Sequence, residues 1–146
     1  MEEGRILGLD VGEARTGVAV SDALGILTSP LVTLQVKSHS EDAAAIARIA
    51  KEQEVIRIVV GLPLNREGGI GPQAQKVLDF IEALRAATPV EVVTIDERYS
   101  TAAAHRALHE SGMRSKKHKP VIDQVAAQQI LQLYLDRARA RRAREG

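Results

Sequence analysis

The stretch that decides the fold is Ile6-Leu7-Gly8-Leu9-Asp10-Val11-Gly12, an apolar run that ends in a carboxylate. It predicts a buried strand over Arg5–Val11, and Gly12 permits the turn that follows. Two more segments rich in Val, Leu and Thr come after short links, over Thr16–Ser21 and Ile26–Val36. Both favour strands. Because the links are short, we expect the three strands to form an antiparallel meander.

The rest of the chain alternates helices and strands. Ser38 and Glu41 have capping-box spacing before a helix over Ala43–Glu54, and the short apolar Val55–Val60 is typical of a strand covered on both faces. The later elements, in chain order, are a loop over 61–72, a helix opened by Pro72, a strand over Val90–Asp96, a helix over Ala102–Glu110 and a last helix from Pro120 to about Arg142. The order βββαβαβαα predicts an α/β fold with a mixed five-stranded sheet and helices on both faces.

Length and composition favour one globular domain. The chain has 146 residues, of which 45% are hydrophobic, so we expect a single domain over 1–146 with a real core. No apolar stretch approaches the roughly 18 residues that cross a bilayer. The N-terminus lacks a signal-peptide pattern, and cysteine is absent. We therefore expect a cytoplasmic protein that does not bind membranes.

Charge is unevenly distributed. From Arg114 onward there are nine Lys and Arg against three Asp and Glu, although the whole chain carries only +1. A basic C-terminal helix end on a more acidic body favours polyanion binding, with a solvated basic helix end as the alternative. Aromatic residues make up 2% of the chain, so nucleic-acid contacts are expected to rely on backbone charge and shape rather than on stacking.

Three acidic residues occupy positions that can converge. Asp10 and Glu97 each end an apolar run, and Asp123 opens the apolar part of the last helix. Two strand ends and a helix start can meet at one sheet edge, where open α/β sheets bind ligands. Carboxylates gathered there repel one another unless cations lie between them. Hard oxygen donors suit Mg²⁺ or Mn²⁺, and such sites drive phosphodiester chemistry. The pattern predicts a metal-dependent nuclease.

Each carboxylate also has a purely structural explanation. Asp10 could form an Asx-type turn, and Asp123 could stabilise the macrodipole of its helix. Glu97 could pair with Arg98 or cap the following helix.

At these positions the chain resembles the YqgF/RuvX family. Four motifs carry the resemblance, in the family's order: Asp10–Asp22, Gly61–Asn65 with Gly68, Asp96–Thr101, and Asp123–Ala127 followed by Leu131. The resemblance implies an RNase H-like fold and kinship with Holliday-junction resolvases. Family members are described as nucleases that process the 5′ end of precursor 16S rRNA.

The same resemblance implies that Asp10, Glu97 and Asp123 are the catalytic triad and bind the metal. One ion would lower the pKa of a bound water and a second would stabilise the leaving 3′-oxygen, which leaves 5′-phosphate and 3′-hydroxyl ends. Related resolvases have a fourth acidic residue that the sequence does not identify. Three residues lie in or near the motifs, but the sequence alone promotes none of them to this role: Asp22, Asp96 and Gln124. One or two metals therefore both stay open.

Basic residues near the motifs are candidate substrate ligands. Arg15 could hold a phosphate or lie on a turn surface, and Arg98 could do the same or orient Glu97. A basic stretch precedes Asp123 and favours phosphate binding close to the metal; its members are Arg114, Lys116, Lys117 and Lys119. The arginines at 137, 139, 141, 142 and 144 could extend this track or lie in solvent.

A loop and three histidines have no assigned role in the site. The loop Asn65–Gly71 could bind phosphate through its N–H groups or serve as a connector. His105 and His109 have zinc-ligand spacing, but no third soft ligand is identifiable, so a solvated helix face is expected. Nothing in the sequence ties His118 to the site.

Several functions compete. Structured RNA and branched DNA can be cut by the same chemistry, but symmetric junction cutting requires a dimer, so the expected state is a monomer or weak homodimer. An actin-like or sugar-kinase ATPase also begins with an Asp-x-Gly turn, but it needs a duplicated domain for which this chain has no room. A non-catalytic nucleic-acid-binding module is the remaining alternative.

Overall fold

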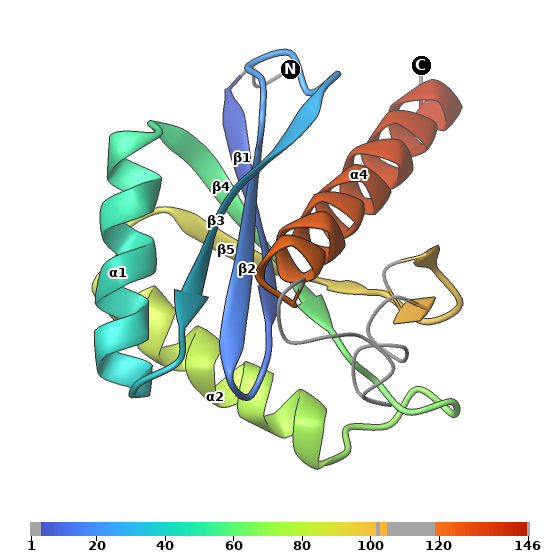
Figure 1. The fold of residues 1–146 in the computed structure, drawn as a ribbon. Coiled ribbons are helices and arrows are strands. Elements are labelled where there is room, and N and C mark those ends of the chain that lie inside the picture. The colour runs from blue at the N-terminus through green and yellow to red at the C-terminus, as the bar shows by residue number, and fades with distance from the viewer. Residues whose placement is uncertain (1–3, 102, 105–118, 146) are drawn as a thin grey trace.

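The computed structural model describes residues 4–101, 103–104 and 119–145. Within them, five strands and three helices are arranged as in Figure 1. The elements are β1 Arg5–Val11, β2 Arg15–Ser21, β3 Thr28–Gln35, α1 His39–Glu52, β4 Val55–Leu62, α2 Pro72–Ala87, β5 Glu91–Asp96 and α4 Lys119–Glu145. None of the helices in these ranges is long and apolar enough to span a bilayer.

The five strands form one mixed sheet in the order β3-β2-β1-β4-β5. β1 pairs antiparallel with β2, and β2 with β3, which confirms the predicted meander. β4 and β5 add on parallel to β1. The strand that carries Asp10 is therefore the centre of the sheet.

Helices cover both faces, as predicted (Figure 1). On one face, Leu7 and Leu9 of β1 pack in a core with Ile46 of α1 and Phe80 of α2. On the other face, Ile6 packs in a core with residues of α4. Alternate side chains of a strand point to opposite faces, so β1 feeds both cores.

Some element ends differ from the sequence prediction. α1 begins at His39 rather than Ala43 because Ser38 is its N-cap and accepts the Glu41 N–H at 3.1 Å. β3 begins at Thr28 rather than Ile26, since Asp22 accepts the Ile26 N–H at 2.8 Å and holds that segment in a turn.

The predicted helix after β5 lies mostly outside the described residues. Its start is visible, because Ser100 Oγ accepts the Ala103 N–H at 3.1 Å, as a helix cap does. α4 continues past Arg142 to Glu145.

Candidate functional site

Asp10 lies on the α4 face of the sheet. Ile6 packs toward α4, whereas Leu7 and Leu9 pack toward the other helices. Because side chains alternate along a strand, Asp10 shares the face of Ile6. Only 8% of Asp10 is exposed, so α4 and its neighbours enclose this carboxylate.

The N-terminal part of α4 brings Asp123 next to Asp10. Asp10 pairs in register with Gly17 of β2. A Cβ atom on Gly17 would overlap the Asp123 carbonyl and lie 3.0 Å from the Asp123 Cβ. The helix therefore rests directly on the glycine opposite Asp10, an approach that no larger residue permits. Asp123 is 6% exposed.

Glu97 reaches the same place from β5. A Cβ atom on Gly61 would overlap Glu97 Oε2 and lie 2.6 Å from Ile130 Cδ1. Gly61 directly follows Val60, which pairs with Leu9, the residue before Asp10. The Glu97 carboxylate thus lies over the strand beside Asp10, under α4, and the residue is 2% exposed.

Three buried carboxylates therefore lie near one edge of the sheet: Asp10 on β1, Glu97 directly after β5 and Asp123 on α4. The side chains do not form a finished cation cage: among the described residues, no three His, Cys, Asp or Glu side chains are grouped so that they could hold a metal ion. Asp123 is instead engaged by Arg15, whose Nε lies 2.8 Å from Asp123 Oδ2. A guanidinium neutralises one carboxylate of the cluster.

Arg98 binds Asp96 rather than Glu97, the carboxylate next to it in sequence. Its guanidinium binds Asp96, with Nη2 2.8 Å from Oδ2, and this bond lowers the pKa of Asp96. Its Nη1 donates to the Arg66 carbonyl at 3.1 Å. Arg98 thereby fastens the loop after β4 to the end of β5, next to Glu97.

That loop is folded on itself. Asn65 accepts the Gly68 N–H on its carbonyl at 2.9 Å and the Gly69 N–H on its Oδ1 at 2.7 Å. Gly68 has a φ of +86°, which favours glycine. Two N–H groups that a phosphate loop would offer are therefore already used, and at these positions the loop is an ordered connector.

Sequence reasoning missed the exposed Tyr99 at the rim of this site. Tyr99 has a φ of +61° and is 84% exposed, and its hydroxyl donates to the Arg66 carbonyl at 3.3 Å. Left-handed backbone in a bulky residue is uncommon, and no sequence pattern signals it.

The remaining candidates fall into two groups. Arg114, Lys116 and Lys117 lie outside the described residues, as do the three histidines considered above and the side chain of Lys119. Of the C-terminal arginines, Arg137 and Arg139 donate to the carbonyls of Asp96 and Gly25 at 2.9 and 3.0 Å. These two arginines brace α4 against the body of the protein.

Comparison with known proteins adds a family and a fold. The chain matches, over residues 4–137, the family model described as RuvX: Holliday junction resolvase. A relative from Clostridioides difficile (strain 630) named "Putative pre-16S rRNA nuclease" is 46% identical over 136 residues, covering 93% of this chain and 96% of the relative. A protein of the same name from Clostridium novyi (strain NT) is 44% identical over 132 residues, covering 90% and 98%.

Solved structures confirm an RNase H-like fold. Thermus thermophilus RuvC in complex with Holliday junction substrate superposes with a TM-score of 0.54 at 16% identity, covering 92% of this chain and 96% of that one. The Fowlpox virus resolvase in complex with Holliday junction DNA gives 0.52 at 9% identity, covering 92% and 98%.

Proposed function

The chain belongs to the RuvX family, and from that premise we propose that it is a divalent-metal-dependent nuclease that processes the 5′ end of precursor 16S rRNA. The observation that supports the proposal is the burial of Asp10, Glu97 and Asp123, each less than a tenth exposed. Asp123 and Glu97 also lie against Gly17 and Gly61, on the two strands that flank Asp10. The names of relatives at 43–46% identity support the RNA substrate. Working on such a substrate, the protein would act in the cytoplasm.

The donor chemistry of the site fits Mg²⁺ or Mn²⁺. Carboxylate oxygens are the hard ligands that these ions prefer. Buried carboxylates that lie near one another are stable as anions only when positive charge offsets them, and Arg15 supplies part of that charge. We infer that Asp10, Glu97 and Asp123 hold the ion. On binding the ion, Asp123 would lose its contact with Arg15. When bound, the ion supplies an acidified water and stabilises negative charge on the phosphate.

The other residues of the site position these groups. Gly17 and Gly61 keep α4 and Glu97 close to the sheet. Arg98 holds the loop after β4 beside Glu97. Once released from Asp123, Arg15 would lie at the site entrance with its guanidinium ready for a substrate phosphate. Arg114, Lys116, Lys117 and Lys119 are proposed to bind flanking phosphates.

Resolution of four-way DNA is the second candidate. It is favoured by the family description and by the fold likeness to RuvC. A resolvase cuts two strands symmetrically and needs two active sites, hence a dimer. RNA processing is ranked first because the relatives named for it are far more similar in sequence.

A cleavage assay separates these functions. A precursor 16S 5′-end RNA and a four-way DNA junction are each incubated with Mg²⁺ or Mn²⁺, with EDTA and Asp10→Asn protein as controls. Metal-dependent cutting of the RNA alone is the expected result. Paired symmetric nicks in the junction would transfer the assignment to resolvase, and no cleavage of either would favour a non-catalytic binding module.

A further inference from the structure

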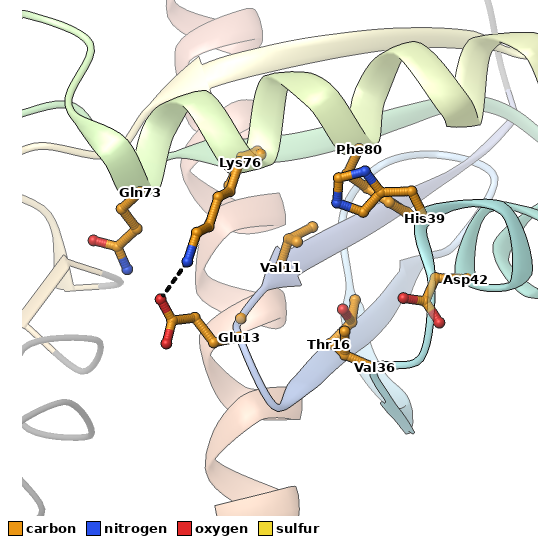
Figure 2. A pocket seen from close by; sticks show the side chains of 11 residues that line it. Val11, Glu13, Thr16, Val36, His39, Asp42, Gln73, Lys76 and Phe80 are labelled. Atoms are coloured by element: carbon orange, nitrogen blue, oxygen red, sulfur yellow. Dashed lines mark hydrogen bonds and ion pairs between the residues drawn. The ribbon is translucent and has the colours of Figure 1, made fainter.

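A cavity of about 210 Å³ lies on the face of the sheet opposite the carboxylates. Figure 2 shows it between the end of β1 and the first turns of α1 and α2. Val11 packs toward the α1 and α2 core, whereas the preceding Asp10 faces α4. The cavity and the carboxylate site are therefore back to back at one end of β1.

One end of the cavity favours an anion. Lys76 and Gln73 of α2 line it (Figure 2). The N-cap of α2 is Gly71, which offers no side-chain cap, and the first turn of the helix has no acidic residue. Backbone N–H groups at an uncapped helix start carry partial positive charge and bind phosphate well.

The other end offers hydrogen-bond acceptors. Asp42 accepts the Lys37 N–H at 3.1 and 3.2 Å, and a carboxylate has room for further donors. Thr16 is only 4% exposed and lines the cavity. A hydroxyl can accept a hydrogen bond from a group in the cavity that Thr16 lines.

Between these ends the cavity is apolar. Its walls are Val11, Val36, Val77 and Phe80. The ring of His39 stands edge-on to Phe80, with centroids 6.1 Å apart and an angle of 72°. Such a wall suits a flat, weakly polar group. The volume lies below the roughly 300–1,000 Å³ of sites for drug-sized ligands, so it accommodates one ring system rather than two.

We propose that this cavity is a nucleotide subsite. A base with an exocyclic amino group donates to Asp42 and Thr16, and its phosphate lies at Lys76 and the start of α2. Lys76 now pairs with Glu13 at 3.0 Å across the opening, and both side chains are exposed. Exposed pairs of this kind are weak, so a phosphate can take the place of Glu13.

The nucleotide in this cavity could be a free mononucleotide or part of the nucleic-acid substrate. A free mononucleotide would make the cavity an effector site, and this source is independent of the proposed function. A base of the nucleic-acid substrate would make it a base-reading site. That source rests on the proposed nuclease, because the strand would have to pass from Asp10 around the β1–β2 turn to Val11.

The test is an NMR titration of the full chain in EDTA, so that nuclease activity does not enter. The 5′-monophosphates of adenosine, guanosine, cytidine and uridine are added separately, followed by a short single-stranded RNA. We expect the amide signals of Thr16 and Val77 to shift with the amino-bearing bases, and uridine to bind about tenfold more weakly. Lys76→Gln should weaken binding about tenfold, whereas Lys51→Gln at the far end of α1 should not.

The source is decided by which ligand binds. Shifts with mononucleotides support an effector site, and shifts with RNA alone support a base-reading site. Failure of the cleavage assay would leave the mononucleotide result intact. The proposal is overturned if no ligand shifts Thr16 and Val77, if Lys76→Gln binds as tightly as the wild type, or if all four bases bind equally.

Discussion

Arg15 Nε lies 2.8 Å from Asp123 Oδ2, a contact between residues 108 positions apart. This bond joins the start of β2 to the first turns of α4, and it places a fixed positive charge among three buried carboxylates. Removing one member of a buried ion pair leaves an uncompensated charge, which destabilises the fold.

Arg15→Gln should therefore lower the free energy of unfolding of the metal-free protein. It should also increase the stabilisation that a bound metal gives. We expect a loss of about 1–3 kcal/mol in the free energy of unfolding with EDTA. Mg²⁺ or Mn²⁺ should stabilise the variant more than the wild type, because Arg15 no longer competes for Asp123. Urea unfolding with and without metal measures both effects, and Arg48→Gln, at an exposed position of α1, is the control. An equal metal response in the two proteins would contradict competition.

Asp10→Asn should abolish metal-dependent cleavage while nucleic-acid binding persists. Loss of one charged ligand removes several kcal/mol of stabilisation of the transition state, which is a rate loss of about 10³-fold or more. Asp79→Asn is the matched control, because Asp79 is exposed on α2, which packs on the opposite face of the sheet, and should leave the rate within about twofold. Single-turnover cleavage and a filter-binding assay give the two readouts. A fully active Asp10→Asn protein would remove this residue from the triad.

Gly17→Ala should displace α4. The added Cβ would overlap the Asp123 carbonyl, and overpacking of this kind costs about 1–3 kcal/mol. Because the helix carries Asp123, metal affinity should fall as well. Gly71→Ser is the control, since a Cβ there meets nothing within 4 Å and serine is a good N-cap. Thermal unfolding and Mn²⁺ titration are the measurements. A Gly17→Ala protein as stable as the wild type would show that α4 can move away from the sheet without loss of stability.

The Asp96–Arg98 pair should make stability depend on acid pH. Hydrogen bonding to Arg98 lowers the pKa of Asp96 below its ordinary 3.8. A carboxyl whose folded pKa is depressed stabilises the fold above its unfolded pKa, and this contribution disappears as pH falls through the folded pKa. The stability difference between wild type and Asp96→Asn should thus be constant near neutrality and shrink below about pH 4. Urea unfolding from pH 3 to 7 tests this, and the pH trend should vanish when Arg98→Gln is the background.

Glu54→Gly should stabilise the protein. Glu54 follows α1 with a φ of +54° and its N–H donates to the Lys51 carbonyl at 3.1 Å. Left-handed backbone costs a residue with a Cβ about 1 kcal/mol, and glycine is the usual choice there. Arg48→Gly inside the same helix should instead cost about 1 kcal/mol. Opposite shifts in the urea midpoint are expected, and a loss at both positions would refute the argument.

Most of the strands and helices could be predicted from the sequence, because the hydrophobic pattern that indicates each one lies within a short segment. The strand ends at Asp10 and Glu97 and the helix start at Asp123 each follow from their neighbours, and sheet topology then places all three near the same edge. The Arg15–Asp123 bond could not be predicted, since it depends on the position of α4 along the sheet. That position is set by the close approach at Gly17.

The cavity escaped prediction for a related reason. Its lining comes from the end of β1, β2, the segment after β3 and two helix starts, and none of these segments has a distinctive motif. The low aromatic content also pointed away from base recognition, yet the described ring pair, His39 and Phe80, lies at this cavity. Composition counts rings but does not locate them.

Asp10 and Val11 face opposite sides of the sheet because the pairing of Asp10 with Gly17 fixes the pleat. A slip of one residue in that pairing would exchange the two faces along the whole of β1. Deleting a single residue from this strand would therefore turn the carboxylate toward the helices of the cavity and the valine toward α4. The cavity and the carboxylates share one hydrogen-bond register, so an insertion or deletion here cannot alter one and spare the other.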